Sequence, residues 1–404
     1  MAPEWAQLHP DLIQAIANRI TAYIDYIRFR AVCVSWNSAV PKFPNHHHHL
    51  PPQIPWLMVP FMGDETESYR CFFSISEDKY HILELPECSE KRICGSSLGW
   101  LLMLEKGPAI NLFNPITRTL IPLPPLTTFP HVVFRPSKFG KEFKVFYTTE
   151  DSEPYSLKTM QNYFIRKMVL SSSPKNDDME EDDNYMVVVI LRTREMAFMR
   201  KGDQVWTLVK DPEFCFEDVI FHKGQCFGLD SDRGVVVCDF DGPSPKLNVV
   251  SSGPQGEFGD YLVDFFGDLL LVSRTREHNH NHTLDYTTTN FRVFKPDQSL
   301  PGWHWHEVKD LGDRVLFLGP NSSMSLLVHE FSGCQRNCIY FADDNYDSHY
   351  LVDEDYDSDD SDEIGAHDLG IFNLYDGSIE PSLYLRRNNW LIWPPPTWVT
   401  PNPS

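Results

Sequence analysis

Two groups of histidines have spacings that could hold a transition metal. Four consecutive histidines occupy residues 46–49, and three more alternate along the chain at His278, His280 and His282. Imidazole is a common transition-metal ligand, and alternate residues of an extended strand lie on one face. Consecutive side chains point in opposite directions, so residues 46–49 are predicted to be a solvated linker. The alternating group could form a weak metal site or a solvated loop, and we predict no metal ion at either place.

Cysteines and carboxylates also lack the spacing of a metal site. Cys334 and Cys338 are wider apart than a Cys-x-x-Cys motif, and no second pair follows them. Residues 353–360, DEDYDSDD, are acidic like a calcium-binding loop but lack the glycine and the glutamate that such a loop requires. The nine cysteines are odd in number and have no framework spacing, so we expect reduced thiols.

Motifs of catalysis are missing from the sequence as well. It contains no Gly-x-Ser-x-Gly elbow, no glycine-rich phosphate loop followed by lysine, and no His-Glu-x-x-His motif. We therefore predict a protein that is not an enzyme and has no cofactor. An enzyme remains an alternative, but it would need acid, base or metal residues that converge only in the folded chain.

Acidic residues dominate the charge of the chain. The formal net charge is −22, and residues 177–183 and 343–363 hold six and eleven acids. Nucleic-acid binding is disfavoured because it depends on a basic surface. No run approaches the roughly eighteen apolar residues of a membrane span, and the N-terminus lacks the pattern of a signal peptide. A cytosolic or nuclear protein is expected.

The first forty residues predict two short helices joined by a tight turn. Pro10 suits the first turn of a helix, and Asp11 favours the positive end of the helix dipole. Asp25 is predicted to cap the second helix. The apolar side of the first helix consists of Leu12, Ile13, Ile16 and Ile20. The apolar side of the second consists of Phe29, Val32, Cys33, Trp36 and Val40.

Helices this short need either the rest of the protein or a partner to bury both apolar sides. Their order, W-x-x-L-x-P-D-L-I, then I-x-x-x-I, then D-Y-I-R-F-R-A-V-C-V-S-W, resembles the F-box family. The residues that match the family's pattern are Leu8, Pro10, Asp11, Leu12, Asp25, Arg28, Arg30, Val32, Cys33 and Trp36. His9 departs from the pattern, since a small residue or proline is usual there, and the segment between the helices is short.

The F-box resemblance implies that residues 1–43 dock on a Skp-type adaptor, and through it on a cullin, in a Skp–cullin–F-box ubiquitin ligase. Skp-type adaptors are acidic, and these residues carry four basic against three acidic side chains. The adaptor-binding residues that the resemblance implies are Leu8, Pro10, Leu12, Ile13, Ile16, Ile20, Val32, Cys33 and Trp36.

The rest of the chain predicts a mainly β protein. Residues 44–55 are rich in proline and histidine and predict a linker that holds the helices away from the strands. From Trp56 onward, short apolar runs recur every eight to twelve residues, which is typical of an all-β fold. Their grouping in fours favours a β-propeller of six blades, with seven possible, in which the first and last strands share a blade. A β-sandwich is the structural rival.

Longer phrases of the same region resemble one group of propellers. Among them are CGSSLGWLLML with NLFNPITRTLIPLP, and VIFHKGQCFGLDSDRGVVVCDF. They resemble the kelch-like β-propeller, formerly domain of unknown function 295, that follows the F-box in many plant proteins. The resemblance covers residues 56–400. Residues 171–184 and 343–367 interrupt the pattern and predict acidic surface loops.

Together these resemblances imply a substrate-recognition subunit of a ubiquitin ligase. The propeller would bind a protein target, which the sequence does not identify. The alternative is an interaction scaffold whose F-box has degenerated and no longer assembles a ligase, for which His9 and the short inter-helix segment are the support.

Overall fold

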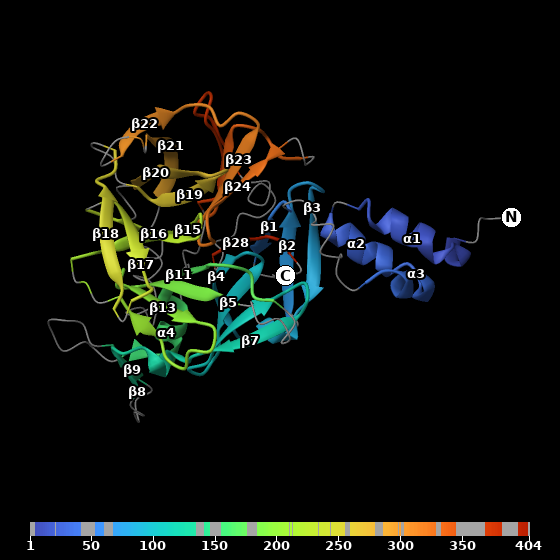
Figure 1. The fold of residues 1–404 in the computed structure, drawn as a ribbon, viewed down its shortest axis with the longest axis horizontal. Helices are drawn as coiled ribbons and strands as arrows, with labels where there is room; N and C mark the ends of the chain where they lie inside the picture. Colours follow the sequence, from blue (N-terminus) through green and yellow to red (C-terminus); the bar gives the residue numbers. More distant parts are fainter. Residues whose placement is uncertain are drawn as a thin grey trace, which may run out of the picture.

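A ring of β-sheets with a group of helices at its edge makes up the structure, a computed structural model (Figure 1). It describes residues 5–20, 22–41, 53–59, 68–134, 141–145, 155–175, 184–209, 211, 213–232, 234–242, 244–254, 259–278, 286–297, 299, 303–328, 333–344, 368–381 and 395–402. Several predicted features lie outside these residues. They are most of the predicted linker, including its four consecutive histidines at 46–49, then His280 and His282, and the middles of both acidic segments. Among the described helices, none is long and apolar enough to span a membrane.

The N-terminal unit contains three α-helices where two were predicted. A 3-10 turn η1 (Trp5–Gln7) precedes α1 (Pro10–Ala17), α2 (Tyr23–Arg30) and α3 (Val34–Ala39). Helix α1 starts at Pro10 with Asp11 in its first turn, as predicted. The predicted second helix is divided because Cys33 is extended, with φ −163° and ψ 170°. We call residues 5–41 the helical unit.

The prediction that Asp25 caps the second helix is wrong. Helix α2 begins two residues earlier, with Ala22 in the N-cap position, so that Asp25 lies in the first turn. The early start places Tyr23 and Tyr26 in the small core of the unit, where each is about 3% exposed. Burial of two aromatic side chains outweighs one capping hydrogen bond. The buried core of the unit consists of Ile13, Ala17, Tyr23, Tyr26 and Val40.

The first half of the ring contains three four-stranded antiparallel sheets. The first joins the two ends of the ring and contains β28 (Thr397–Val399), β1 (Trp56–Val59), β2 (Tyr69–Ser74) and β3 (Lys79–Glu84). The second contains β4 (Arg92–Ser97), β5 (Trp100–Leu104), β6 (Ile110–Asn114) and β7 (Thr119–Leu123). The third contains β11 (Ile165–Leu170), β12 (Met186–Leu191), β13 (Met196–Arg200) and β14 (Thr207–Leu208).

The second half contains three more sheets. The fourth contains β15 (Phe216–His222), β16 (Gln225–Asp230), β17 (Gly234–Asp239) and β18 (Lys246–Ser251). The fifth contains β19 (Tyr261–Phe265), β20 (Asp268–His278), β21 (Tyr286–Asp297) and β22 (His304–Val308). The sixth contains, in spatial order, β24 (Met324–Leu327), β23 (Arg314–Leu318), β25 (Cys338–Phe341), β26 (Gly370–Asn373) and β27 (Ile379–Pro381).

A smaller insertion separates the second and third sheets. It contains the 3-10 turn η3 (Leu126–Thr128), a three-stranded sheet and a helix; a further 3-10 turn, η2 (Pro86–Cys88), joins the first two sheets. The three strands are β8 (Val132–Phe134), β9 (Lys141–Val145) and β10 (Tyr155–Ser156), and the helix is α4 (Leu157–Tyr163).

Pairing between the two ends of the strand region closes the ring, as predicted. Strand β28 runs antiparallel to β1, with Leu57 opposite Trp398. The Ser96 hydroxyl donates to the Trp398 carbonyl and so links the closing strand to the next sheet. Closure covers sheet edges that would otherwise be open to pairing with other chains. The six large sheets follow one another around a centre and do not stack in two layers, which excludes the sandwich (Figure 1).

The sixth sheet departs from a simple up-and-down order. Strand β23 runs parallel to β25, and β24 lies on the other side of β23. The turn between β23 and β24 reaches strand β4, where the Ser322 N–H donates to the Ser96 carbonyl at 2.8 Å. A Cβ atom on Gly95 would lie 2.9 Å from the Pro320 carbonyl oxygen, so only glycine allows this approach. The turn therefore packs against strand β4.

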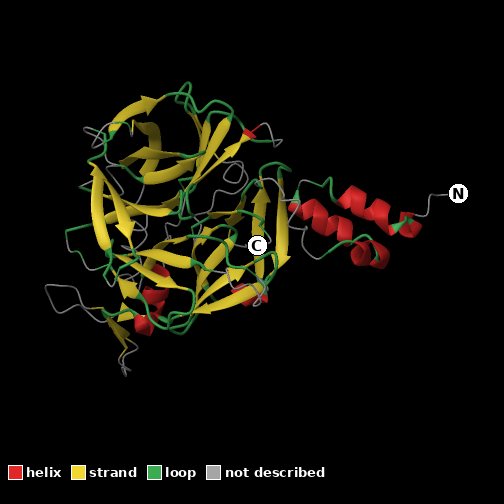
Figure 2. Ribbon diagram, viewed as in Figure 1, coloured by secondary structure: helices red, strands yellow, loops and turns green. Residues whose placement is uncertain are grey.

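The helical unit packs directly against the ring, and the prediction that the linker holds it away is wrong. Figure 2 shows the helices beside the strands of the first sheet. Ile116, in the turn between β6 and β7, packs against the core of the helical unit. Ile24 packs against the cluster that contains Trp56. Burial of apolar surface between the two parts explains why the proline-rich segment does not separate them.

Candidate functional site

The helical unit exposes five large apolar side chains. The largest exposed fractions there belong to Trp5 (59%), Leu12 (55%), Ile16 (41%), Val32 (58%) and Val34 (83%). We call these five residues the apolar face. Exposed apolar side chains that gather on a small unit are characteristic of a protein-binding surface.

The residues predicted to bind an adaptor fall into three groups. Leu12, Ile16 and Val32 belong to the apolar face, and Pro10 is also exposed. Ile13 is 1% exposed and lies in the core of the unit, so its side chain supports the helices from within. The others are half-buried, and they are Leu8, Ile20, Cys33 and Trp36.

Trp36 holds the first turn of the unit against its last helix. Its indole N–H donates to the Trp5 carbonyl at 2.9 Å, and its ring lies 4.4 Å from that of Phe29. The Ser35 hydroxyl donates to the Ala6 carbonyl at 2.8 Å and adds a second link. Trp36 thus holds Trp5, a member of the apolar face, in place.

Two members of the apolar face were not among the predicted residues. Val34 follows the break at Cys33. The sequence predicted one continuous helix there, so this break was not expected. Trp5 lies in the 3-10 turn ahead of α1. A signal for Trp5 was present, since it opens the W-x-x-L phrase of the family pattern.

Charged groups fix the orientation of the helical unit on the ring. The Arg28 guanidinium lies 3.0 Å from both Asp25 and Glu77, and Glu77 lies in the turn between β2 and β3. Lys79 and His81 contact the other oxygen of Glu77, each at 2.8 Å. The hydrogen bond from Arg28 lowers the pKa of Glu77 to about 2. The Tyr23 N–H also donates to the Gln53 side chain at 2.9 Å.

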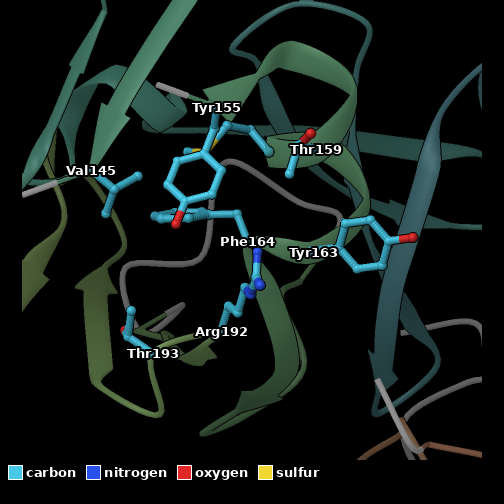
Figure 3. Close-up of a pocket in the computed structure, with 8 residues that line it drawn as sticks. Val145, Tyr155, Thr159, Tyr163, Phe164, Arg192 and Thr193 are labelled. Carbon is cyan, nitrogen blue, oxygen red and sulfur yellow. The ribbon is translucent and has the colours of Figure 1, made fainter. Parts of the chain in front are cut away.

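A hollow of about 270 Å³ lies between the small insertion and the third sheet (Figure 3). Tyr155, Thr159 and Tyr163 line it from β10 and α4, and Arg192 lines it from the turn after β12. The Arg192 guanidinium lies 5.9 Å from the centre of the Tyr155 ring. Carboxylate, imidazole and thiol groups are absent from the described lining.

A buried ionic network joins the fifth and sixth sheets. Arg274 has a fully buried side chain and contacts Asp344 at 3.1 Å and Asp368 at 2.9 Å. Arg276 contacts the same oxygen of Asp344 at 2.8 Å. Asp344 and Asp368 lie at the two ends of the second acidic segment, and Arg274 ties these ends together.

Metal-ligating groups do not converge in the part of the chain that the structure describes. Cys338 is buried, and its Sγ lies 3.3 Å from the Arg336 carbonyl. All nine cysteines are free thiols, as predicted, and six of them are buried.

A closed ring of mostly four-stranded antiparallel sheets defines a β-propeller protein, here with a helical unit at its N-terminal side. Residues 72–373 match the model of the KIB1-4 beta-propeller. The chain belongs to this family.

Similar proteins are plant F-box proteins. The F-box protein SKIP23 of Arabidopsis thaliana is 26% identical over 426 residues, which cover 98% of this chain and 96% of that one. The F-box protein At2g26160 of the same plant is 25% identical, with coverage of 84% and 96%. The putative F-box protein At3g25750 is 27% identical and covers 93% of each chain. The first alignment spans the helical unit as well as the propeller.

Proposed function

We propose that this chain is the substrate-recognition subunit of a Skp–cullin–F-box ubiquitin ligase. Residues 1–43 would be the F-box that docks on a Skp-type adaptor, residues 44–55 the linker, and residues 56–400 a six-bladed propeller that binds the target protein. Six sheets of four or five strands support the blade count, with the three-stranded sheet as an insertion. The names of the relatives support the F-box assignment.

The mechanism is proximity. The chain would hold a target beside a ubiquitin-charged enzyme recruited through the cullin, which raises the effective concentration of the target there. The subunit itself would perform no covalent step. Its place of action would be the cytosol, the nucleus or both.

The apolar face carries this proposal. Leu12, Ile16 and Val32 match the adaptor-binding pattern and are each at least 41% exposed, although the helices have a core of their own. A unit that buries Ile13 in its own core and leaves the neighbouring Leu12 exposed has an apolar surface that can bind a second protein. Adaptor binding would therefore involve Leu12, Ile16 and Val32, with Trp5 and Val34 beside them.

Co-purification with a Skp-type adaptor tests the assignment. Leu12→Asp and Val32→Asp would place charges on the apolar face, and we expect both to abolish adaptor binding while the propeller stays folded. Ile82→Asp is a matched control, because Ile82 is also 55% exposed but lies on strand β3. Adaptor binding that survives both charge substitutions would overturn the proposal.

The structure weakens one of the two arguments for a scaffold with a degenerate F-box, the one based on His9. His9, the residue that departs from the family pattern, occupies the N-cap of α1 and its Nδ1 accepts from the Asp11 N–H at 3.4 Å. A capping side chain at this place is compatible with the helix that the F-box needs. The same co-purification separates the two functions, since a scaffold would not retain the adaptor.

A further inference from the structure

Phe266 occupies a turn position that a phenylalanine seldom adopts. Phe265 pairs with Asp268 across the β19–β20 hairpin, which leaves Phe266 and Gly267 as a two-residue turn. Both have positive φ, 55° for Phe266 and 90° for Gly267. Hairpin turns of this kind favour Asn-Gly or Asp-Gly, because a bulky side chain is strained there. The ring is nevertheless 54% exposed, so the strain is not offset by burial.

Arg314 lies over this exposed ring. Its Cζ atom is 3.2 Å from the centre of the Phe266 ring and 4.9 Å from that of Phe265. The Arg314 side chain makes no hydrogen bond or ion pair within the described residues, and its Nη1 is an unsatisfied donor. Stacking on the ring therefore holds a guanidinium that has no carboxylate partner there.

Lys223 adds a second cation from the neighbouring sheet. It lies in the turn between β15 and β16, and its Cε is 3.7 Å from the place where a Cβ on Gly267 would stand. Lys223 is exposed and, within the described chain, has no ion-pair partner. Lys223, Phe266 and Arg314 come from three successive sheets, and we call them the Phe266 rim.

Three acids of the adjoining turns and strands have contacts of their own among the described residues. Asp268 pairs with Lys295 at 2.5 Å, and Asp313 lies 3.6 Å from Arg336. Asp264 accepts the Gly267 N–H at 3.4 Å and lies 3.2 Å from the imidazole of His222. Neither cation of the rim has an ion-pair partner among the described residues, in a chain whose formal net charge is −22.

We propose that the Phe266 rim binds an acidic segment of the target protein. A carboxylate of that segment would pair with Arg314 or Lys223, and a neighbouring apolar side chain would pack on the Phe266 ring. Arginine and aromatic side chains are enriched where interfaces are strongest, and complementary charge selects the partner. The inference rests on the proposed function, because it names the surface that would hold the target.

Peptide selection on the full chain tests the rim. A random peptide library displayed on phage is selected against the wild-type protein, and the affinities of enriched peptides are measured by fluorescence anisotropy. We expect enriched peptides to combine acidic and apolar residues and to bind more weakly in high salt.

The variants are chosen so that folding and binding separate. Phe266→Asn creates the favoured Asn-Gly turn, so the protein should fold with an unchanged or higher Tm and yet bind the peptide at least about tenfold more weakly. Arg314→Gln should weaken binding similarly. Val205→Ser is the control, because Val205 is 55% exposed at a distant position and should not affect the peptide.

Several outcomes would overturn the inference. Enriched peptides without acidic residues, or peptides that bind Phe266→Asn and Arg314→Gln as well as wild type, would exclude the rim. A dimer of the wild type that Phe266→Asn abolishes, seen by sedimentation, would show that a second copy covers it. Adaptor co-purification is measured on the same variants, and we expect it to be unchanged. Loss of peptide binding without loss of adaptor binding separates the rim from the proposed function.

Discussion

Arg28 of helix α2 and Glu77 of the β2–β3 turn form an ion pair of 3.0 Å between the helical unit and the propeller. Ile24 and Ile116 add apolar contacts between the same two parts. Together these contacts give the apolar face a defined direction relative to the propeller. Under the proposed function, this direction would determine where a bound target stands relative to the ligase.

The Glu77 contact predicts a specific dependence of stability on pH. The folded protein lowers the pKa of Glu77 from 4.5 to about 2, chiefly through the hydrogen bond from Arg28. Its contribution to the free energy of unfolding is therefore full above about pH 4.5 and is lost as the pH falls toward 2. Urea unfolding of wild type and Glu77→Gln from pH 7 to pH 3 measures this contribution. The difference between the two proteins should shrink as the pH falls, and a constant difference would contradict the prediction.

Leu12 and Ile13 are neighbours in sequence with opposite environments, 55% and 1% exposed. Leu12→Ala should change the free energy of unfolding by less than about 0.5 kcal/mol. It should nevertheless weaken adaptor binding. Ile13→Ala should destabilise the helical unit by about 2–5 kcal/mol, because it leaves a cavity in a small core. Urea unfolding and adaptor affinity, measured on both variants, distinguish surface from core. Equal losses of stability would show that the two side chains share one environment.

Substitution of Arg274 is expected to lower the free energy of unfolding strongly. Arg274→Met would leave the buried carboxylate of Asp368 without its cation and Asp344 with Arg276 alone, at a cost of about 3–5 kcal/mol in the free energy of unfolding. Arg292→Met is the matched control, since Arg292 and Glu307 form a pair of 3.1 Å that is about one-third exposed. That substitution should cost less than about 1 kcal/mol. A similar small loss for Arg274→Met, in chemical denaturation, would contradict the buried role.

Much of the fold could be predicted because strands leave a local signal. Each of the large sheets corresponds to apolar runs recognised from Trp56 onward, with turn residues between them. The order in the sixth sheet could not be predicted, because the parallel pairing of β23 with β25 depends on contacts distant in sequence. Strand β27 and the small insertion also lacked a strong periodic signal.

The candidate sites could be predicted from the sequence less well than the fold. The F-box phrase identified the helices, but four-residue spacing placed Leu12 and Ile13 on one apolar side, and only packing separated them. Phe266 ends the apolar run YLVDFF of residues 261–266, but β19 stops at Phe265 and Phe266 lies in the turn. The signal was the following Phe-Gly-Asp, whose glycine permits the tight turn.

Residue order alone determined the all-β character of the propeller region, the position of the F-box-like helices and the pairing of the first and last strands, because local patterns of apolar and turn residues encode them. The tertiary structure decided which apolar side chains remain in water, where the helical unit rests, and that Lys223, Phe266 and Arg314 meet. These outcomes depend on side chains from separate sheets, and the contacts between them form only when the ring closes.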